Sequence, residues 1–224
     1  MNFDLIRRLV LKDWHFLRLP LTLYLVGGVA SLVLVSRPST FGFYIGSTLL
    51  ISIVITVGIH LAMATVVEER TKQTLPFVMS LPISPLEYAT AKLASCLLLY
   101  VVPWLVLAVG TVAVIARSAA IPDGLIPYAV LVLTWLFVAY CLILAVALVT
   151  ESQGWTIATM VVTNLALQAF LYLVSHQPAI AAEMKGQAIL WSSPSLAILG
   201  AELAVIVALL ALTFALQARK TDFL

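Results

Sequence analysis

Six long runs of apolar residues constrain the fold of this chain more than any other feature of its sequence. They lie at residues 19–36, 43–66, 89–116, 125–149, 154–174 and 197–217. About 20 consecutive apolar residues cross the hydrocarbon core of a bilayer as a helix, and lipid offers no partner for an unpaired backbone amide. With 63% hydrophobic and only 10% charged residues, the chain leaves no room for a separate soluble domain. We therefore expect one all-α integral membrane domain with six transmembrane helices.

The basic residues predict the orientation of these helices. Six spans place both ends of the chain on the same side of the membrane. Nine lysines and arginines lie on that side, and three, Arg37, Arg117 and Lys185, lie on the other. Because cytoplasmic loops carry the excess of basic residues, we expect a multi-pass protein of the cytoplasmic (inner) membrane with both termini in the cytoplasm.

Two segments outside the spans have patterns of their own. In residues 1–18, apolar residues alternate with charged ones at near-helical spacing, which predicts an amphipathic helix lying in the membrane interface. The alternative is a polar extension that continues the first helix. The second segment, residues 175–196, connects the last two spans as an extracytoplasmic loop and is apolar enough to lie in the interface, either as a re-entrant hairpin or as a simple interfacial loop.

The cytoplasmic loop at residues 67–88 is the most charge-rich stretch of the chain. Charges gather at its front, apolar residues from Leu75 onward follow, and Pro82 and Pro85 break the backbone before the next helix. This pattern predicts a short helix that fits a pocket in a soluble partner. The alternative is a solvated loop anchored by a few apolar side chains.

The stretch EERTKQTLPFVMSLPISPLEYATAKL, from Glu68 to Leu93, resembles the segment after the second span of type-2 ATP-binding-cassette (ABC) exporter permeases. Thr74 and Leu75 match the family's Gly-Thr-Leu core, Leu81 and Pro82 match its Leu-Pro pair, and Lys92 matches its downstream basic residue. Gln73 stands where the family has Gly. The six-span plan with an amphipathic start is also similar to the compact members whose ATPase is a separate chain.

This resemblance implies a function and a set of partners. The chain would be the permease subunit of an exporter that moves an amphiphilic or lipophilic substrate, such as a drug, peptide or lipid, outward across the membrane. It would pair with a second copy or a related chain and contact membrane lipid. The net charge of +2 is too small, and too evenly divided along the chain, to suggest nucleic acid as a partner. A cytoplasmic ABC ATPase subunit would bind ATP and Mg, so that this chain itself carries no cofactor and no metal. The implied ATPase-coupling residues are Glu68, Glu69, Arg70, Thr71, Thr74 and Leu75.

Polar residues within two of the spans are the candidates for a substrate path or for the seam between two permeases. The second span carries Thr48, Ser52, Thr56 and His60 at intervals of four residues, and the fifth carries Thr159, Thr163, Asn164 and Gln168. Amides are too costly to face lipid, so they should face protein or water. The alternative is that these side chains only form hydrogen bonds between neighbouring helices.

Three smaller features complete the predictions. Glu202 lies near the outer end of the last span, where it would sit at head-group depth or pair with a neighbouring helix. Gly42 and Gly46 form a small-xxx-small pair that permits close helix approach. No His-Glu-x-x-His, Gly-x-Ser-Gly or phosphate-binding Gly-x-x-x-x-Gly-Lys-Ser/Thr sequence is present, so we expect no catalytic site in this chain.

Two other classes of function stay open from the sequence. One is a secondary transporter or channel driven by an ion gradient, and the other is a membrane scaffold subunit without transport. A proton-coupled carrier usually places acids near the bilayer midplane, and the central thirds of the six expected spans contain none. The sequence therefore favours an energy source outside the chain.

Overall fold

The computed structural model describes the backbone of residues 3–67 and 85–218, and the side chains of residues 10–67 and 90–218. This part of the chain is helical and contains no strand. The long helices are α1 (Phe3–Val35), α2 (Thr40–Ala62), α5 (Pro85–Arg117), α6 (Leu125–Thr150), α7 (Gln153–His176) and α9 (Ser193–Ala218). A π-helical turn, η1 (Met63–Val67), extends α2, and a short helix, α8 (Pro178–Glu183), lies between α7 and α9.

Helix ends follow from local sequence. Ser39 precedes α2 in an extended conformation, and its side chain accepts a hydrogen bond from the Gly42 amide, as an N-cap residue does. Glu151 ends α6 in the left-handed conformation, with φ of 56°. Pro178 takes a first-turn position in α8, where its missing N–H is not needed.

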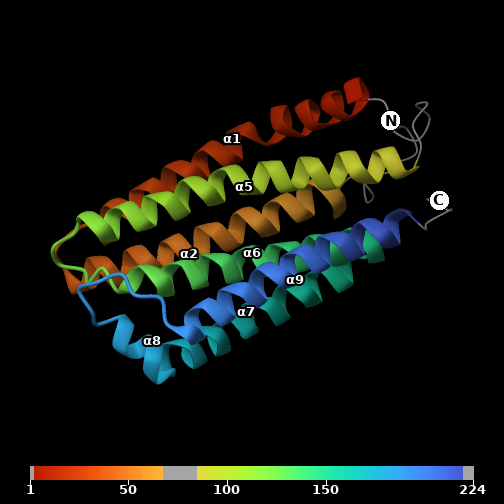
Figure 1. Cartoon of the computed structure of the whole chain (residues 1–224). Coiled ribbons are helices and arrows are strands. Elements are labelled where there is room, and N and C mark those ends of the chain that lie inside the picture. Colours follow the sequence, from red (N-terminus) through yellow and green to blue (C-terminus); the bar gives the residue numbers. More distant parts are fainter. Residues whose placement is uncertain (1–2, 68–84, 219–224) are drawn as a thin grey trace.

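The long helices form one bundle in which α6 occupies the middle (Figure 1). Helix α6 packs against α2, α5, α7 and α9, while α1 covers α2 and α5. More than half of the apolar stretch of α6 is buried, against about a sixth for α9. Helix α1 begins and α9 ends at the same end of the bundle, as an even number of spans requires.

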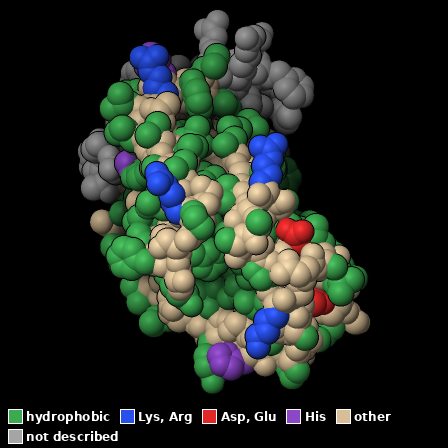
Figure 2. Space-filling model, turned by 90° about the vertical axis from the view of Figure 1, so that its left-hand side faces the viewer, with side chains coloured by type: hydrophobic (Ala, Val, Ile, Leu, Met, Phe, Trp, Pro, Cys, Tyr) green, Lys and Arg blue, Asp and Glu red, His purple; other side chains and the backbone are tan. Residues whose placement is uncertain are grey.

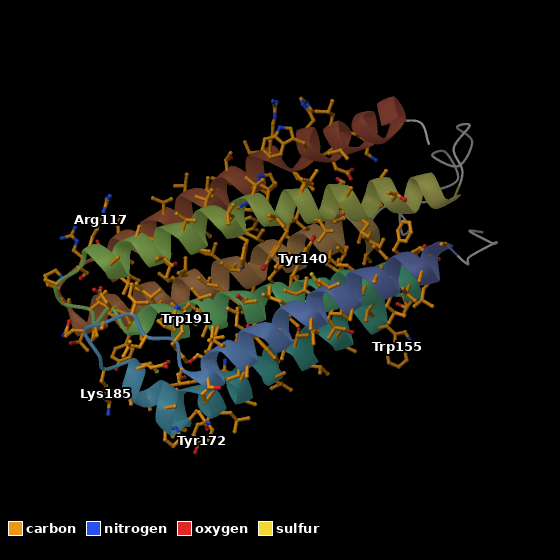
Figure 3. The ribbon with its side chains drawn as sticks, in the orientation of Figure 1. Arg117, Tyr140, Trp155, Tyr172, Lys185 and Trp191 are labelled. Atoms are coloured by element: carbon orange, nitrogen blue, oxygen red, sulfur yellow. The ribbon has the colours of Figure 1, made fainter. Side chains whose placement is uncertain are left out.

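The largest apolar cluster joins α2, α5 and α6. It includes Tyr140, whose ring stacks on Tyr100 at a centroid distance of 3.8 Å and whose hydroxyl donates to the Cys96 carbonyl at 2.7 Å. Tyr140 points into the space between the helices (Figure 3). Since both rings are almost fully buried, they fix the spacing of α5 and α6.

The outer surface has the features of a bilayer-embedded protein. Many large apolar side chains of α1, α5, α7 and α9 are exposed. Trp155 and Tyr172, at opposite ends of α7, are 66% and 62% exposed and point outward (Figure 3). Their separation along the helix is about 26 Å, close to the thickness of the hydrocarbon core, and aromatic residues favour both interfaces.

The six expected spans are confirmed. All six long helices are long and apolar enough to cross a membrane, so the chain is a multi-pass membrane protein. The expected boundary at residue 18 is not a helix end, because α1 runs without interruption from Phe3 to Val35 through Pro20. In secondary structure, the N-terminal segment therefore continues the first span.

The predicted small-residue contact is also present. A Cβ atom on Gly46 would lie 2.8 Å from the Ser31 carbonyl oxygen and 2.8 Å from the Val35 amide nitrogen. At Gly42 it would lie 3.0 Å from the Leu34 carbonyl oxygen. Glycine at these positions lets the backbones of α1 and α2 approach each other.

Candidate functional site

The predicted ATPase-coupling residues Glu68, Glu69, Arg70, Thr71, Thr74 and Leu75 lie outside the described residues. The described chain stops at Val67 on one side of this segment and resumes at Pro85 on the other. Both flanking helix ends lie at the end of the bundle where α1 begins and α9 ends (Figure 1).

The hydroxyl stripe of α2 faces away from the bundle. Thr48, Ser52 and Thr56 are exposed. Ser52 donates to the Thr48 carbonyl at 2.8 Å, and Thr56 donates to the Ser52 carbonyl at 2.7 Å. These hydroxyl protons are therefore satisfied within the helix, and the stripe bonds no other described helix.

His60 lies beside this stripe rather than on it. It is half-buried, and its Nδ1 atom lies 3.3 Å from the Tyr24 hydroxyl of α1, with the two rings edge to face. This contact ties the middle of α1 to α2. The structure thus separates His60 from the three outward hydroxyls with which the sequence grouped it.

The polar residues of α7 differ in their exposure. Thr163 is buried and Asn164 is half-buried, and both bond carbonyls one turn back in their own helix. Thr159 is half-buried and likewise donates to the Trp155 carbonyl. Gln168 is exposed, and no hydrogen bond joins its side-chain amide to any described residue.

A narrow cleft lies between α2 and α7, floored by α6. Val54 and Gly58 line it from α2, Tyr140 lines it from the floor, and Thr163 and Asn164 line it from α7. Its volume of about 20 Å³ holds roughly one water molecule. The structure therefore brings Thr163 and Asn164 to a common cleft with α2, but this arrangement is closed to any amphiphile.

A buried ion pair joins α1 to α5, and sequence reasoning did not find it. Lys92 Nζ lies 3.2 Å from Asp13 Oδ2, and the Ser95 hydroxyl donates to the same oxygen at 2.9 Å. All three side chains are buried. Sequence reasoning selected Lys92 by resemblance alone. Asp13, within an alternating charged segment, gave no signal that distinguished it from its neighbours.

The segment between α7 and α9, which the sequence predicts to be an extracytoplasmic loop, contains the short helix α8. Ile180 of α8 is fully buried against α6, α7 and α9. The buried Glu183 carboxylate accepts hydrogen bonds from the Ser192 amide and the Ser195 hydroxyl, at the start of α9. A carboxylate at this position satisfies free amide groups and opposes the positive end of the helix dipole.

The charged groups at this end of the bundle are dispersed. Arg117 and Lys185 are exposed and lie apart (Figure 3). In the surface view of this end, basic and acidic side chains are scattered among hydrophobic ones (Figure 2). No large patch of charge of one sign is visible on this face.

Glu202 does not pair with a neighbouring helix in the described part of the chain, contrary to one of the two sequence-based expectations. It is the tenth residue of the 26-residue helix α9, because the helix begins four residues earlier than expected. Its side chain is only 5% exposed, and neither carboxyl oxygen has a hydrogen-bond partner within the described chain. It is therefore enclosed by protein but pairs with no neighbouring helix.

No known protein-family model matches this chain, and no curated protein and no solved structure matches it significantly. The geometry above is thus the basis for a functional proposal, together with the resemblance of residues 68–93.

Proposed function

We propose that this chain is the permease subunit of an ATP-driven ABC exporter of the type-2 kind, working with separate cytoplasmic ATPase subunits. It moves an amphiphilic or lipophilic substrate outward, and two permease chains form the path. The protein lies in the cytoplasmic (inner) membrane, and both of its termini are in the cytoplasm.

The observation that carries the proposal is the outward polar face of α2 and α7. Thr48, Ser52 and Thr56 on α2 and Gln168 on α7 are exposed at the depth of the spans. The hydroxyls are satisfied within their helix, but the Gln168 amide bonds no described residue. Leaving such an amide in lipid costs several kcal/mol. This face therefore favours contact with a second permease chain or with a wet path between the two.

The narrow cleft between α2 and α7 supports a substrate path that opens only when these helices move apart. With room for about one water molecule, the space between α2 and α7 excludes substrate in this state. An ATPase that moves the ends of α2 and α5, the two helices flanking residues 68–84, would act directly on one wall of this cleft, because Val54 and Gly58 belong to α2.

The face assignment is tested by cysteine substitution in the full chain in native membranes. The chain's own Cys96 and Cys141 are both buried, so they give little background. Gln168→Cys should either cross-link between two copies or react with a water-soluble maleimide. Val207→Cys, on a 66% exposed apolar position of α9, is the matched lipid-facing control and should do neither. If Gln168→Cys behaves like Val207→Cys, the face is not a seam or a path.

The coupling assignment is tested by ATP hydrolysis. The permease copurified with its ATPase and reconstituted in lipid should show ATPase activity that hydrophobic compounds stimulate. Glu69→Ala with Arg70→Ala should abolish that stimulation while leaving membrane insertion intact. Gln153→Ala, an exposed polar substitution at the start of α7, should leave the stimulation unchanged. Normal ATP-dependent export by the double variant would contradict the coupling role of these residues.

One observation favours the ion-gradient alternative. A buried acid, Glu202, lies about 14 Å along α9 from its first residue, and acids within membrane helices commonly belong to proton relays. Transport by the purified chain in vesicles with a proton gradient, no nucleotide and no second protein would establish that alternative and overturn the ATP-driven proposal.

A further inference from the structure

The surroundings of Glu202 are set by the packing of α9 on α6. These two helices run in the same direction, and residues that meet across the seam differ by a nearly constant number. Leu131 shares an apolar cluster with Ile198 and Leu199, Val138 shares another with Ile206, and the Gln217 side chain donates to the Leu148 carbonyl 69 residues earlier. The offset of about 68 residues places Glu202 opposite residues 133–135 of α6.

None of these three residues gives the Glu202 carboxyl a partner. The Leu133 carbonyl accepts from the Trp104 indole at 2.9 Å, and the Thr134 hydroxyl donates to the Val130 carbonyl at 2.9 Å. The Trp135 indole N–H is buried and also has no hydrogen-bond partner. The Trp135 ring stacks on Phe170 of α7 and lines the cleft between α2 and α7, so it does not belong to the seam with α9. Among the described residues of α6, none is therefore a hydrogen-bond partner of the Glu202 carboxyl.

No charge within the seam is available to neutralise an ionised carboxyl. Helix α6 contains no Asp, Glu, Lys, Arg or His, and Glu202 is the only such residue in α9. The thiol of Cys141 lies two turns farther along α6, beside Ile206. The cations of α5, Lys92 and Arg117, lie near the two ends of that helix.

The remaining neighbour, α8, contributes only Glu183 as a charged residue, and that carboxylate is engaged by Ser192 and Ser195. Ser195 lies seven residues before Glu202 in α9, which is about 10 Å along the helix. The acid of α8 therefore serves a different site and provides no proton partner for Glu202.

From this arrangement we propose that Glu202 is an intramembrane proton-binding site, protonated while α9 is packed on α6 and deprotonated when the two helices separate. Placing an unpaired carboxylate in an apolar interior costs several kcal/mol, whereas the neutral acid avoids most of that cost. When the seam opens, the carboxyl O–H bond breaks, its electron pair stays on the carboxylate oxygen, and the proton passes to water admitted between the helices.

This site does not depend on the ATP-driven proposal, because it follows from the packing of α6 and α9 alone. A permease could use it to couple helix separation to proton release, whichever energy source drives the separation. Its test can therefore fail while the exporter proposal stands, and the reverse also holds.

The test is infrared spectroscopy of the full chain in lipid nanodiscs over a range of pH. At neutral pH the wild-type protein should show the carbonyl-stretching band of a protonated carboxylic acid. Glu202→Gln should lose that band. Glu183→Gln, the matched substitution at the buried acid that has hydrogen-bond partners, should keep it. At strongly alkaline pH the band of the wild-type protein should disappear.

Two results would overturn the proposal. One is an identical carboxylic-acid region in the wild-type and Glu202→Gln proteins at neutral pH, which means that Glu202 is ionised there. The other is a Glu202 band that persists at every pH at which the protein stays folded, which means that no proton exchanges. Should Glu202→Gln not fold, Glu202→Leu supplies the same spectroscopic comparison, because an apolar side chain suits this seam.

Discussion

Lys92 and Asp13, which are 79 residues apart in the sequence, form an ion pair of 3.2 Å with both side chains buried. The pair joins the first turns of α5 to the part of α1 that precedes Pro20. The Ser95 hydroxyl shares the same carboxylate oxygen. A buried pair of this kind fixes the relative position of two helices, because either charge without the other is strongly unfavourable.

We predict that Asp13→Ala destabilises the protein by about 3 to 5 kcal/mol, since it leaves Lys92 buried without this carboxylate. The expected fall in Tm is about 6 to 20 °C, measured by circular dichroism in detergent. Replacing both residues, as Asp13→Leu with Lys92→Met, should recover most of the loss. Lys12→Ala is the control: its side chain is 40% exposed and lies 3.7 Å from Asp13, so its effect should be below about 1 kcal/mol. Equal effects of the two alanine substitutions would count against a structural pair.

Because Tyr140 stacks on Tyr100, we predict that two substitutions of Tyr140 differ in their effect on the free energy of unfolding. Tyr140→Phe keeps the ring on Tyr100 and removes only the hydroxyl that donates to Cys96, so it should cost about 1 kcal/mol. Tyr140→Ala empties a nearly fully buried site and should cost about 3 to 5 kcal/mol. Tyr172→Ala, at a 62% exposed position, should have a small effect on the same unfolding measurement. A Phe variant as unstable as the Ala variant would show that the hydroxyl dominates instead.

The close contact of α1 and α2 at Gly46 predicts that alanine is destabilising there and harmless at an open glycine position. A Cβ on Gly46 would meet the α1 backbone at 2.8 Å, whereas a Cβ on Gly200 of α9 has no atom within 4 Å. Gly46→Ala should therefore push the helices apart and destabilise the protein by about 1 to 3 kcal/mol. Gly200→Ala should be neutral or stabilise by up to about 1 kcal/mol, because alanine favours a helix. Detergent melting curves that rank the two variants in the opposite order would refute the close contact.

We predict that replacing Glu183 loosens the loop between α8 and α9. Glu183→Ala removes the acceptor for the Ser192 amide and the Ser195 hydroxyl, and hydrogen bonds to a charged group contribute about 1.5 to 3 kcal/mol. The open state of this loop should become roughly ten times more populated or more. Trypsin cleavage after the exposed Lys185 should accelerate accordingly, with Gln177→Ala as the control. A cleavage rate that does not change would mean that Glu183 does not hold the loop.

Sequence reasoning predicted the architecture well because its signal is local. Each span is an apolar run long enough to cross a bilayer, and each run must be helical since lipid cannot satisfy backbone amides. The small-xxx-small pair of Gly42 and Gly46 also predicted a close helix approach, but only the structure shows that α1 is the partner helix. The predicted start of α9 was four residues too late, since Ser193 and Ser195 are polar and Glu183, from another element, bonds the Ser192 amide and the Ser195 hydroxyl at this helix start.

The candidate site was predicted less completely. Thr163 and Asn164 do share a cleft with α2, but Thr48, Ser52 and Thr56 face outward and His60 contacts Tyr24. Spacing in a sequence tells which residues share a helix face, but not which direction that face has in the bundle. The predicted coupling residues from Glu68 to Leu75 stay a prediction.

The sequence by itself determined that this protein is a bundle of six membrane-crossing helices, because hydrophobic length is a property of each segment alone. The tertiary structure decided which polar groups meet. Asp13 pairs with Lys92, Glu183 holds the start of α9, and the Glu202 carboxyl has no hydrogen-bond partner among the residues that the structure describes. Those relationships depend on the rotation and register of whole helices against one another, which are set by side-chain packing across the bundle and not by any local run of residues.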